Sequence, residues 1–364
     1  MVRNYGIDLL KILAMFMVIV LHILGQGGVL KNLTPTLFFS KYSIAWFIEI
    51  GAYCAVNCYA IITGYNYYER SVKWNKLLIL WLQVAFYSIG ITAIFLMYGT
   101  HINSSIWFKT LLPVISASYW YVTAYFGMCL FIPMMNNFLF NAEKKKIELT
   151  LFLFFIILSV LPTLFNVDPF KLNRGYSMIW ICILYLIGGY LKKHNIQDHL
   201  SSSKALLYYV CAVILTWCSK VGIEFLSYEF LGKIKYGNVF IKYTSPTIIL
   251  AAVFLFLGLA KLKITNEKII KMIGILSPAA FGVYLIHLHP LIWSRVIKNF
   301  AVSFTKMSCI EMLSTVFGVA ILAYLVLSVI DMLRMKIFSI LNINKKTERF
   351  CTYVKEKLLH TKLM

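Results

Sequence analysis

Long apolar runs alternate with short polar segments along nearly the whole chain, and this pattern predicts membrane-spanning helices. A helix needs about 20 predominantly apolar residues to cross a bilayer. We expect spans at residues 7–25, 43–65, 77–99, 119–139, 147–165, 176–192, 204–222, 244–261, 272–293 and 311–335. The pattern therefore predicts an all-α polytopic bundle, with a membrane domain over residues 1–338 and a basic cytoplasmic tail over 339–364.

Composition excludes an ordinary soluble domain. Hydrophobic residues make up 60% of the chain and charged residues only 13%, whereas soluble domains carry about 25% charged residues. The first apolar run lacks a small-residue cleavage site and continues into a full span, so we expect it to remain in the mature protein. The eight cysteines are scattered without a CxxC pair, and no metal site is predicted.

The net charge of +21 indicates a topology rather than a nucleic-acid partner. If both termini are cytoplasmic, most of the 35 lysines and arginines fall in inner loops and in the tail, as the positive-inside rule requires. We therefore expect a multi-pass membrane protein with both ends inside. Cations in short loops beside a membrane suit anionic lipid headgroups, so we expect membrane lipids as partners and no nucleic acid.

The first span carries three ionisable residues, Asp8, Lys11 and His22. Such groups within a membrane helix cost several kcal/mol unless they face a partner or water, so they mark a candidate site. Lys11 and His22 share one helix face, and His22 lies ~16 Å further outward by helical rise. Asp8 is three residues before Lys11 and is predicted to form a structural pair with it.

Other polar and aromatic residues are predicted at the depth of His22. They are Glu49 in the second span, Trp120 and Tyr121 at the start of the fourth, and His287 and His289 at the end of the ninth. A histidine can take a proton from a sugar hydroxyl, and a carboxylate can orient that histidine. We predict His22 and Glu49 as catalytic residues and the other four as substrate-binding residues. Three alternatives remain open: a structural role for His289, which precedes Pro290, an aromatic belt for Trp120 and Tyr121, and for Glu49 a position at the membrane interface or beside a nearby cation that it balances.

A cationic cluster follows the second span at the predicted cytoplasmic face. Arg70, Lys73 and Lys76 lie within seven residues of one another. Such a cluster suits the phosphates of coenzyme A, and we predict that these three residues bind the donor together with Lys11. The alternative is that they only set the topology of the span.

Five segments occur in the order found in the family-three membrane acyltransferases. They are LLKILAMFMVIVLH, VNCYAIITGYNYYE, YWYVTAYFGMCLFIPMMN, YSMIWICILYLIGGYLKK and SPAAFGVYLIHLHPLI. From residue 6 to about 335, the chain resembles the branch of surface-polysaccharide O-acyltransferases that also contains the membrane part of the vancomycin-resistance serine racemase. The resemblance implies a protein of the bacterial cell membrane with a cytoplasmic acyl-CoA donor, usually acetyl-CoA, and no permanently bound cofactor. It also implies an acceptor hydroxyl on an envelope or capsular polysaccharide or on a lipid-linked glycan.

The resemblance also assigns residues. The family's hallmark is an arginine, ten residues and then a histidine in the first span, and here Lys11 stands at the arginine position with His22 as the histidine. Lysine keeps the charge but loses the planar fork of arginine. The family's paired arginines after the second span correspond either to Arg70 and Lys73 or to Lys73 and Lys76.

Three alternatives stay open at the level of the sequence. The acyl group could be another one, such as succinyl. Transfer could be direct, or it could pass through a covalent intermediate on a serine or tyrosine. A protein of another class, a glycan or amino-acid transporter without transferase activity, would also use polar groups at mid-membrane, although no inverted repeat or pair of matching broken helices is evident.

Overall fold

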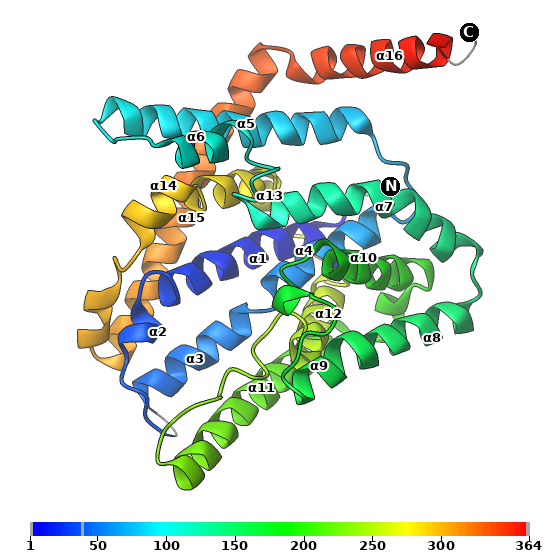
Figure 1. Ribbon diagram of the computed structural model, residues 1–364. Coiled ribbons are helices and arrows are strands. Elements are labelled where there is room, and N and C mark those ends of the chain that lie inside the picture. The colour runs from blue at the N-terminus through cyan, green and yellow to red at the C-terminus, as the bar shows by residue number, and fades with distance from the viewer. Residues whose placement is uncertain (1–2, 38–39, 362–364) are drawn as a thin grey trace.

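The chain folds into a helical bundle without β-strands among the residues that the computed structural model describes, 3–37 and 40–361 (Figure 1). This confirms the predicted all-α polytopic class. Residues 1–2 and 38–39 of the predicted membrane domain and 362–364 of the predicted tail lie outside the described part.

Eight helical segments in the described part are long and apolar enough to cross a membrane. They are α1 (Tyr5–Leu24), α3 (Lys41–Ala52) with α4 (Ala55–Tyr67), α5 (Trp74–Met97), α7 (Trp120–Asn141), α8 (Lys144–Phe155) continuing into α9 (Leu161–Leu164), α11 (Ser202–Leu231), α13 (Glu267–His287) and α15 (Cys309–Ile340). The other two predicted spans fall on the shorter helices α10 (Met178–Lys193) and α12 (Pro246–Ala260). Each predicted span therefore coincides with a helix.

The remaining elements connect these helices or follow them. They are α2 (Val29–Asn32), α6 (Ser104–Leu111), α14 (Pro290–Ile292) and α16 (Ile343–Thr361), with 3₁₀ turns at Asn173–Gly175, Ile196–His199 and Val302–Lys306 and π-helical turns at Ile156–Val160 and Trp293–Ile297. Several helix starts follow from local side-chain chemistry. The Asn4 side chain accepts from the Ile7 amide at the start of α1, and Ser308 and Glu311 form a capping box at α15.

Three predicted spans differ from the observed helices at one point each. The second is broken between α3 and α4, at Tyr53 and Cys54. The ninth ends at His287, because Pro290 begins a new helix. The seventh, predicted to end at residue 222, is too short, because α11 continues to Leu231.

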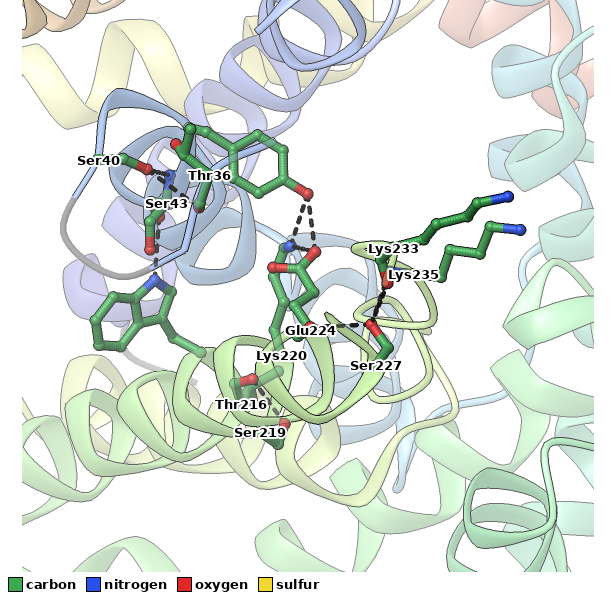
Figure 2. Close-up of polar contacts among 12 residues, drawn as sticks. Thr36, Ser40, Ser43, Thr216, Ser219, Lys220, Glu224, Ser227, Lys233 and Lys235 are labelled. Atoms are coloured by element: carbon green, nitrogen blue, oxygen red, sulfur yellow. Dashed lines mark hydrogen bonds and ion pairs between the residues drawn. The ribbon is translucent and has the colours of Figure 1, made fainter. Parts of the chain in front are cut away.

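A buried ion pair explains why α11 continues. Lys220 and Glu224 lie one helical turn apart and pair with each other, and the Tyr42 hydroxyl of α3 donates to the same carboxylate over 2.8 Å (Figure 2). Both charged side chains are almost fully buried. Because each charge is satisfied by the other and by Tyr42, the helix carries them without turning outward into a loop.

Helix α1 runs through the middle of the bundle (Figure 1), in contact with α3, α4, α12, α13 and α15. Two glycines allow a close approach nearby: a Cβ added at Gly64 of α4 or at Gly188 of α10 would collide with a carbonyl oxygen of the other helix. Small residues at a helix interface are typical of membrane bundles. The central position of α1 keeps its ionisable residues away from the surface that faces lipid.

Candidate active site

A cavity of about 780 Å³ lies at the end of α1 that is far from the N-terminus. Its size falls within the range of about 300–1,000 Å³ that is typical of small-molecule sites. Its polar and aromatic lining residues include His22, Gln26, Glu49, Tyr53, Tyr59, Lys109, Trp120, Tyr121, Tyr176, Tyr243, Tyr284 and Trp293. Four of the six residues predicted at this depth thus share one cavity wall: His22, Glu49, Trp120 and Tyr121.

The hydrogen bonds of His22 define which of its ring nitrogens is free. His22 Nδ1 lies 3.0 Å from His287 Nε2, and His287 Nδ1 lies 2.6 Å from the Val283 carbonyl oxygen. A carbonyl only accepts, so His287 Nδ1 carries the proton, and Nε2 of the neutral ring is an acceptor. His22 Nδ1 therefore donates to His287, which leaves a lone pair on His22 Nε2.

Neighbouring rings hold the His22 imidazole in place. The Trp293 ring meets it edge to face, with ring centroids 4.8 Å apart. The His287 ring is tilted at 45° to that of His22, with ring centroids 5.1 Å apart. His22 is half-buried and reaches the cavity, whereas His287 is buried behind it and is not part of the cavity wall. The prediction that His287 contacts substrate does not fit this position, because His287 contacts His22 and does not line the cavity.

Glu49 brings a carboxylate to the same cavity. Glu49 is 7% exposed, and its Oε2 atom has no hydrogen-bond partner among the described residues. Among the residues that the structure describes, no hydrogen bond joins Glu49 to His22. Buried polar atoms are nearly always satisfied, so Oε2 is a candidate to bind a hydroxyl in the cavity.

Aromatic side chains form much of the cavity wall. The Trp120 ring lies 4.6 Å from that of Tyr176 and stacks at 6.1 Å on that of Tyr243, measured between centroids. The hydroxyls of Tyr121 and Tyr284 are buried without a hydrogen-bond partner among the described residues. Flat apolar faces with free hydroxyls at their edges suit a ligand that presents both C–H and O–H groups, as a sugar ring does.

Buried polar contacts position the outer segments that complete this wall. The Asn57 side chain of α4 donates to the Tyr243 carbonyl over 2.9 Å and accepts from Trp180 Nε1 over 3.2 Å. Asn57 is fully buried. This link fixes the segment that follows α11 against α4 and α10, and it places the Tyr243 ring in the cavity.

His289 lies outside the cavity wall, although it is only two residues from His287. Its Nε2 contacts the Ser88 carbonyl at 3.1 Å and the Thr92 hydroxyl at 3.2 Å, and its Nδ1 accepts from the Leu291 amide. It is 1% exposed. The prediction of substrate binding does not fit this position, and the contacts match the structural alternative, in which His289 ties α5 to the start of α14.

At the other end of α1, Asp8 and Lys11 form the ion pair that their spacing predicts. Lys11 Nζ lies 2.8 Å from Asp8 Oδ1, and Arg3 Nε lies 2.6 Å from Oδ2. Ser277 of α13 also donates to this carboxylate, over 3.2 Å. Two cations share one carboxylate, so this end of α1 keeps a net positive charge.

The cavity does not extend to Lys11 in this structure. On α1 it ends at Met15, one helical turn away, and the Tyr59 hydroxyl donates to the Lys11 carbonyl over 2.6 Å beside that point. Arg70, Lys73 and Lys76 are exposed, in the segment between α4 and α5 and in the first turn of α5. Asn136 of α7 fixes that segment by donating to the carbonyls of Tyr67 and Arg70. The cationic residues therefore stand apart from the cavity.

Two buried ion pairs and several cavity residues were missed at the level of the sequence. Asp331 of α15 is fully buried, pairs with Arg334 at 2.8 Å and accepts from the Tyr87 hydroxyl at 2.7 Å. Asp331 and Arg334 were recognisable in the same way as His22, as ionisable residues within a predicted span. Tyr53, Tyr176 and Tyr243 gave no such signal, because their side chains converge only in the folded bundle. No group of three His, Cys, Asp or Glu residues in the described part is placed to hold a metal ion.

A comparison with protein families finds one match that spans nearly the whole chain. A family model described as an acyltransferase domain covers residues 4–331. No curated protein and no solved structure matches the chain. The matched range contains the cavity, the ion pair of α1 and the cationic segment after α4.

Proposed function

The chain belongs to the family-three membrane acyltransferases, and we propose that it moves an acetyl group from cytoplasmic acetyl-CoA to a hydroxyl of an envelope or capsular polysaccharide at the bacterial cell membrane. Its membership of this family sets aside the alternative of a transporter without transferase activity. The observation that carries the proposal is the state of His22, whose Nδ1 is held by His287 while Nε2 keeps a lone pair. A general base needs such an oriented, unprotonated nitrogen within reach of its substrate.

The proposed reaction is direct transfer. His22 Nε2 takes the proton of the acceptor hydroxyl, the oxygen attacks the thioester carbonyl carbon, and the carbon–sulfur bond breaks. The coenzyme A thiolate leaves and takes the proton back from His22. Glu49 binds a second acceptor hydroxyl or stabilises the imidazolium ring, and no protein nucleophile is needed.

The donor is proposed to enter from the cytoplasmic side. The net positive charge around Arg3, Asp8 and Lys11 and the exposed residues Arg70, Lys73 and Lys76 favour the binding of several phosphate groups. The thioester then has to pass from the depth of Lys11 to that of His22, a rise of ~16 Å along α1. Because the cavity ends at Met15 and Tyr59, these two side chains must move aside to admit it.

The acceptor is proposed to bind from the outer side, against Trp120 and Tyr121. These two residues and Glu49 provide aromatic faces, hydroxyls and one carboxylate within the same cavity as His22. That combination supports a carbohydrate acceptor, because sugar binding needs apolar stacking together with a few placed polar groups.

A cellular experiment tests the proposal. A strain that lacks this protein is complemented with wild type or with His22→Ala, and the acyl groups released from its envelope polysaccharide are identified by mass spectrometry. We expect acetyl groups to return with wild type only, at an unchanged amount of polymer. Acetyl groups restored by His22→Ala would contradict the role of His22, and succinyl in place of acetyl would correct the donor. In purified protein, label from acetyl-CoA retained on the denatured chain would replace direct transfer by a covalent route.

A further inference from the structure

Four cationic residues from four separate segments either line the cavity or lie within two residues of a cavity residue in the sequence. Lys109 of α6 lines the cavity itself. Arg174 lies two residues before Tyr176 and Lys242 directly precedes Tyr243, both of which are cavity residues, and Arg295 lies two residues after Trp293. Lys109, Arg174 and Arg295 are exposed and Lys242 is half-buried. We refer to these four residues as the rim cations.

The rim cations have no salt-bridge partner in the described part of the chain. Asp168, the acid closest to Arg174 in sequence, accepts from the amides of Leu172 and Asn173 over 2.8 and 2.7 Å. Its carboxylate thereby shapes the loop that presents Arg174 and forms no salt bridge there.

Two of the rim cations also act on each other. Burial lowers the pKa of Lys242, and the nearby Arg174 guanidinium lowers it further, while Asp168 raises it in part. Lys242 donates to the amide oxygen of Asn166 over 2.7 Å, which supplies no charge. Two like charges thus stand close together beside the cavity, an arrangement that costs free energy unless an anion offsets it.

The segment that carries Lys242 is held in a fixed position. Ser227 donates to the Lys233 carbonyl over 3.0 Å and accepts from the Lys235 amide over 2.8 Å. The Lys220–Glu224 pair lies directly behind, with Gly237 packed against Glu224. Figure 2 shows the Lys233 and Lys235 side chains projecting away from this anchor. These contacts therefore fix the backbone of the segment that carries Lys242 and Tyr243.

From these contacts we propose that the acceptor is an anionic glycan, whose phosphate or carboxylate groups bind the rim cations while a hydroxyl of the same or a neighbouring sugar reaches His22. This inference rests on the proposed function and names the class of acceptor. The positive-inside rule gives outer loops few cations, so the rim cations need another reason to be there. Lipid headgroups are a second source of anionic groups, but Lys109 lines the cavity and the other three rim cations adjoin cavity residues in the sequence, which favours the substrate as their partner.

The test uses purified protein in nanodiscs with labelled acetyl-CoA and two matched acceptors, a hexuronic acid oligosaccharide and its carboxyl-reduced form. We expect the charged acceptor to be preferred in kcat/KM by roughly tenfold at low salt, with the preference falling as ionic strength rises. The triple variant Lys109→Gln, Arg174→Gln, Lys242→Gln should bring the ratio of the two kcat/KM values close to one, mainly through KM for the charged acceptor. Lys306→Gln, an exposed cation away from the cavity wall, is the matched control and should keep the wild-type ratio.

Three results would overturn the inference. The first is equal kcat/KM for both acceptors with wild type. The second is a preference that the triple variant keeps. The third is an effect of the triple variant on kcat/KM that changes with the charge of the nanodisc lipids but is the same for the two acceptors. That result would identify the lipid headgroups as the ligand. Transfer to the reduced acceptor that depends on His22 would at the same time uphold the proposed function, whereas no transfer to either acceptor would refute both.

Discussion

At the scale of single residues, the hydrogen bond from His22 Nδ1 to His287 leaves His22 Nε2 unprotonated. His287 accepts that bond because its own Nδ1 proton is committed to the Val283 carbonyl. The pair thus resembles the arrangement in which a buried group fixes the tautomer of a catalytic histidine, with a second imidazole in place of a carboxylate. His287 is accordingly a positioning residue, and its effect on transfer passes through His22.

Substitutions of His287 should separate this role from packing. His287→Gln keeps an acceptor for the His22 Nδ1 proton, whereas His287→Leu does not. Because a general base contributes about 10²–10⁴ in rate, we expect His287→Leu to lower kcat at least tenfold with little change in KM for the acceptor, and His287→Gln to recover most of the loss. Steady-state kinetics on both variants test this, with thermal unfolding in detergent as a control for folding. Equal kcat values for the two variants would contradict the positioning role.

Glu49 should show an opposite effect on stability and on activity. An unpartnered buried polar atom costs roughly 1–3 kcal/mol, and Glu49 Oε2 has no partner among the described residues. We expect Glu49→Leu, which removes the unpartnered polar atom, to raise the melting temperature by a few degrees and to lower acetyl transfer. Differential scanning fluorimetry and a transfer assay on the same preparation measure the two quantities. A variant that is both less stable and fully active would show that Glu49 is structural.

At the scale of elements, buried ion pairs allow apolar helices to carry charge through the bundle. In α11 the pair is Lys220 and Glu224, and in α15 it is Asp331 and Arg334, each within one helical turn. Hydroxyls from neighbouring helices, Tyr42 of α3 and Tyr87 of α5, complete the two clusters. Each cluster therefore joins a long helix to a neighbour, and the one in α11 also supports the segment that carries Lys242.

A double-mutant cycle at Lys220 and Glu224 tests the first of these clusters. Removal of one partner leaves an uncompensated buried charge, which costs about 3–5 kcal/mol, whereas removal of both is often close to neutral. We expect Lys220→Met and Glu224→Gln each to lower the thermal stability strongly, and the double variant to recover most of it. Additive losses in the double variant would show that the two side chains do not stabilise each other.

At the scale of the whole molecule, the hydrophobic pattern predicted much of the fold because bilayer thickness fixes helix length. Every predicted span coincides with a helix, and depth alone brought His22, Glu49, Trp120 and Tyr121 to one cavity. Depth does not determine how a helix is rotated or where it ends. That is why His287 and His289, two residues apart, separate at the end of α13, and why Tyr243 from a distant segment was not foreseen. The Lys220–Glu224 pair was predictable from its spacing of four residues.

The predicted topology is testable with two native cysteines. Cys309 begins α15 and Cys351 lies in α16, and both are half-buried. With both termini in the cytoplasm, a membrane-impermeant maleimide added to intact cells should label Cys309 and spare Cys351. Cells opened with detergent provide the control, in which both should be labelled. Labelling of Cys351 in intact cells would show that the predicted orientation is wrong. The cavity would then open on the cytoplasmic side, where an external acceptor could not reach it.

The most direct measurement is acetyl transfer by purified protein in nanodiscs, supplied with labelled acetyl-CoA and an envelope glycan, with wild type and His22→Ala compared side by side. If His22 is the base, label enters the glycan with wild type, and His22→Ala transfers about 10²–10⁴-fold more slowly while still binding the donor. Equal rates for the two proteins would contradict the central claim that acyl transfer takes place in the cavity around His22.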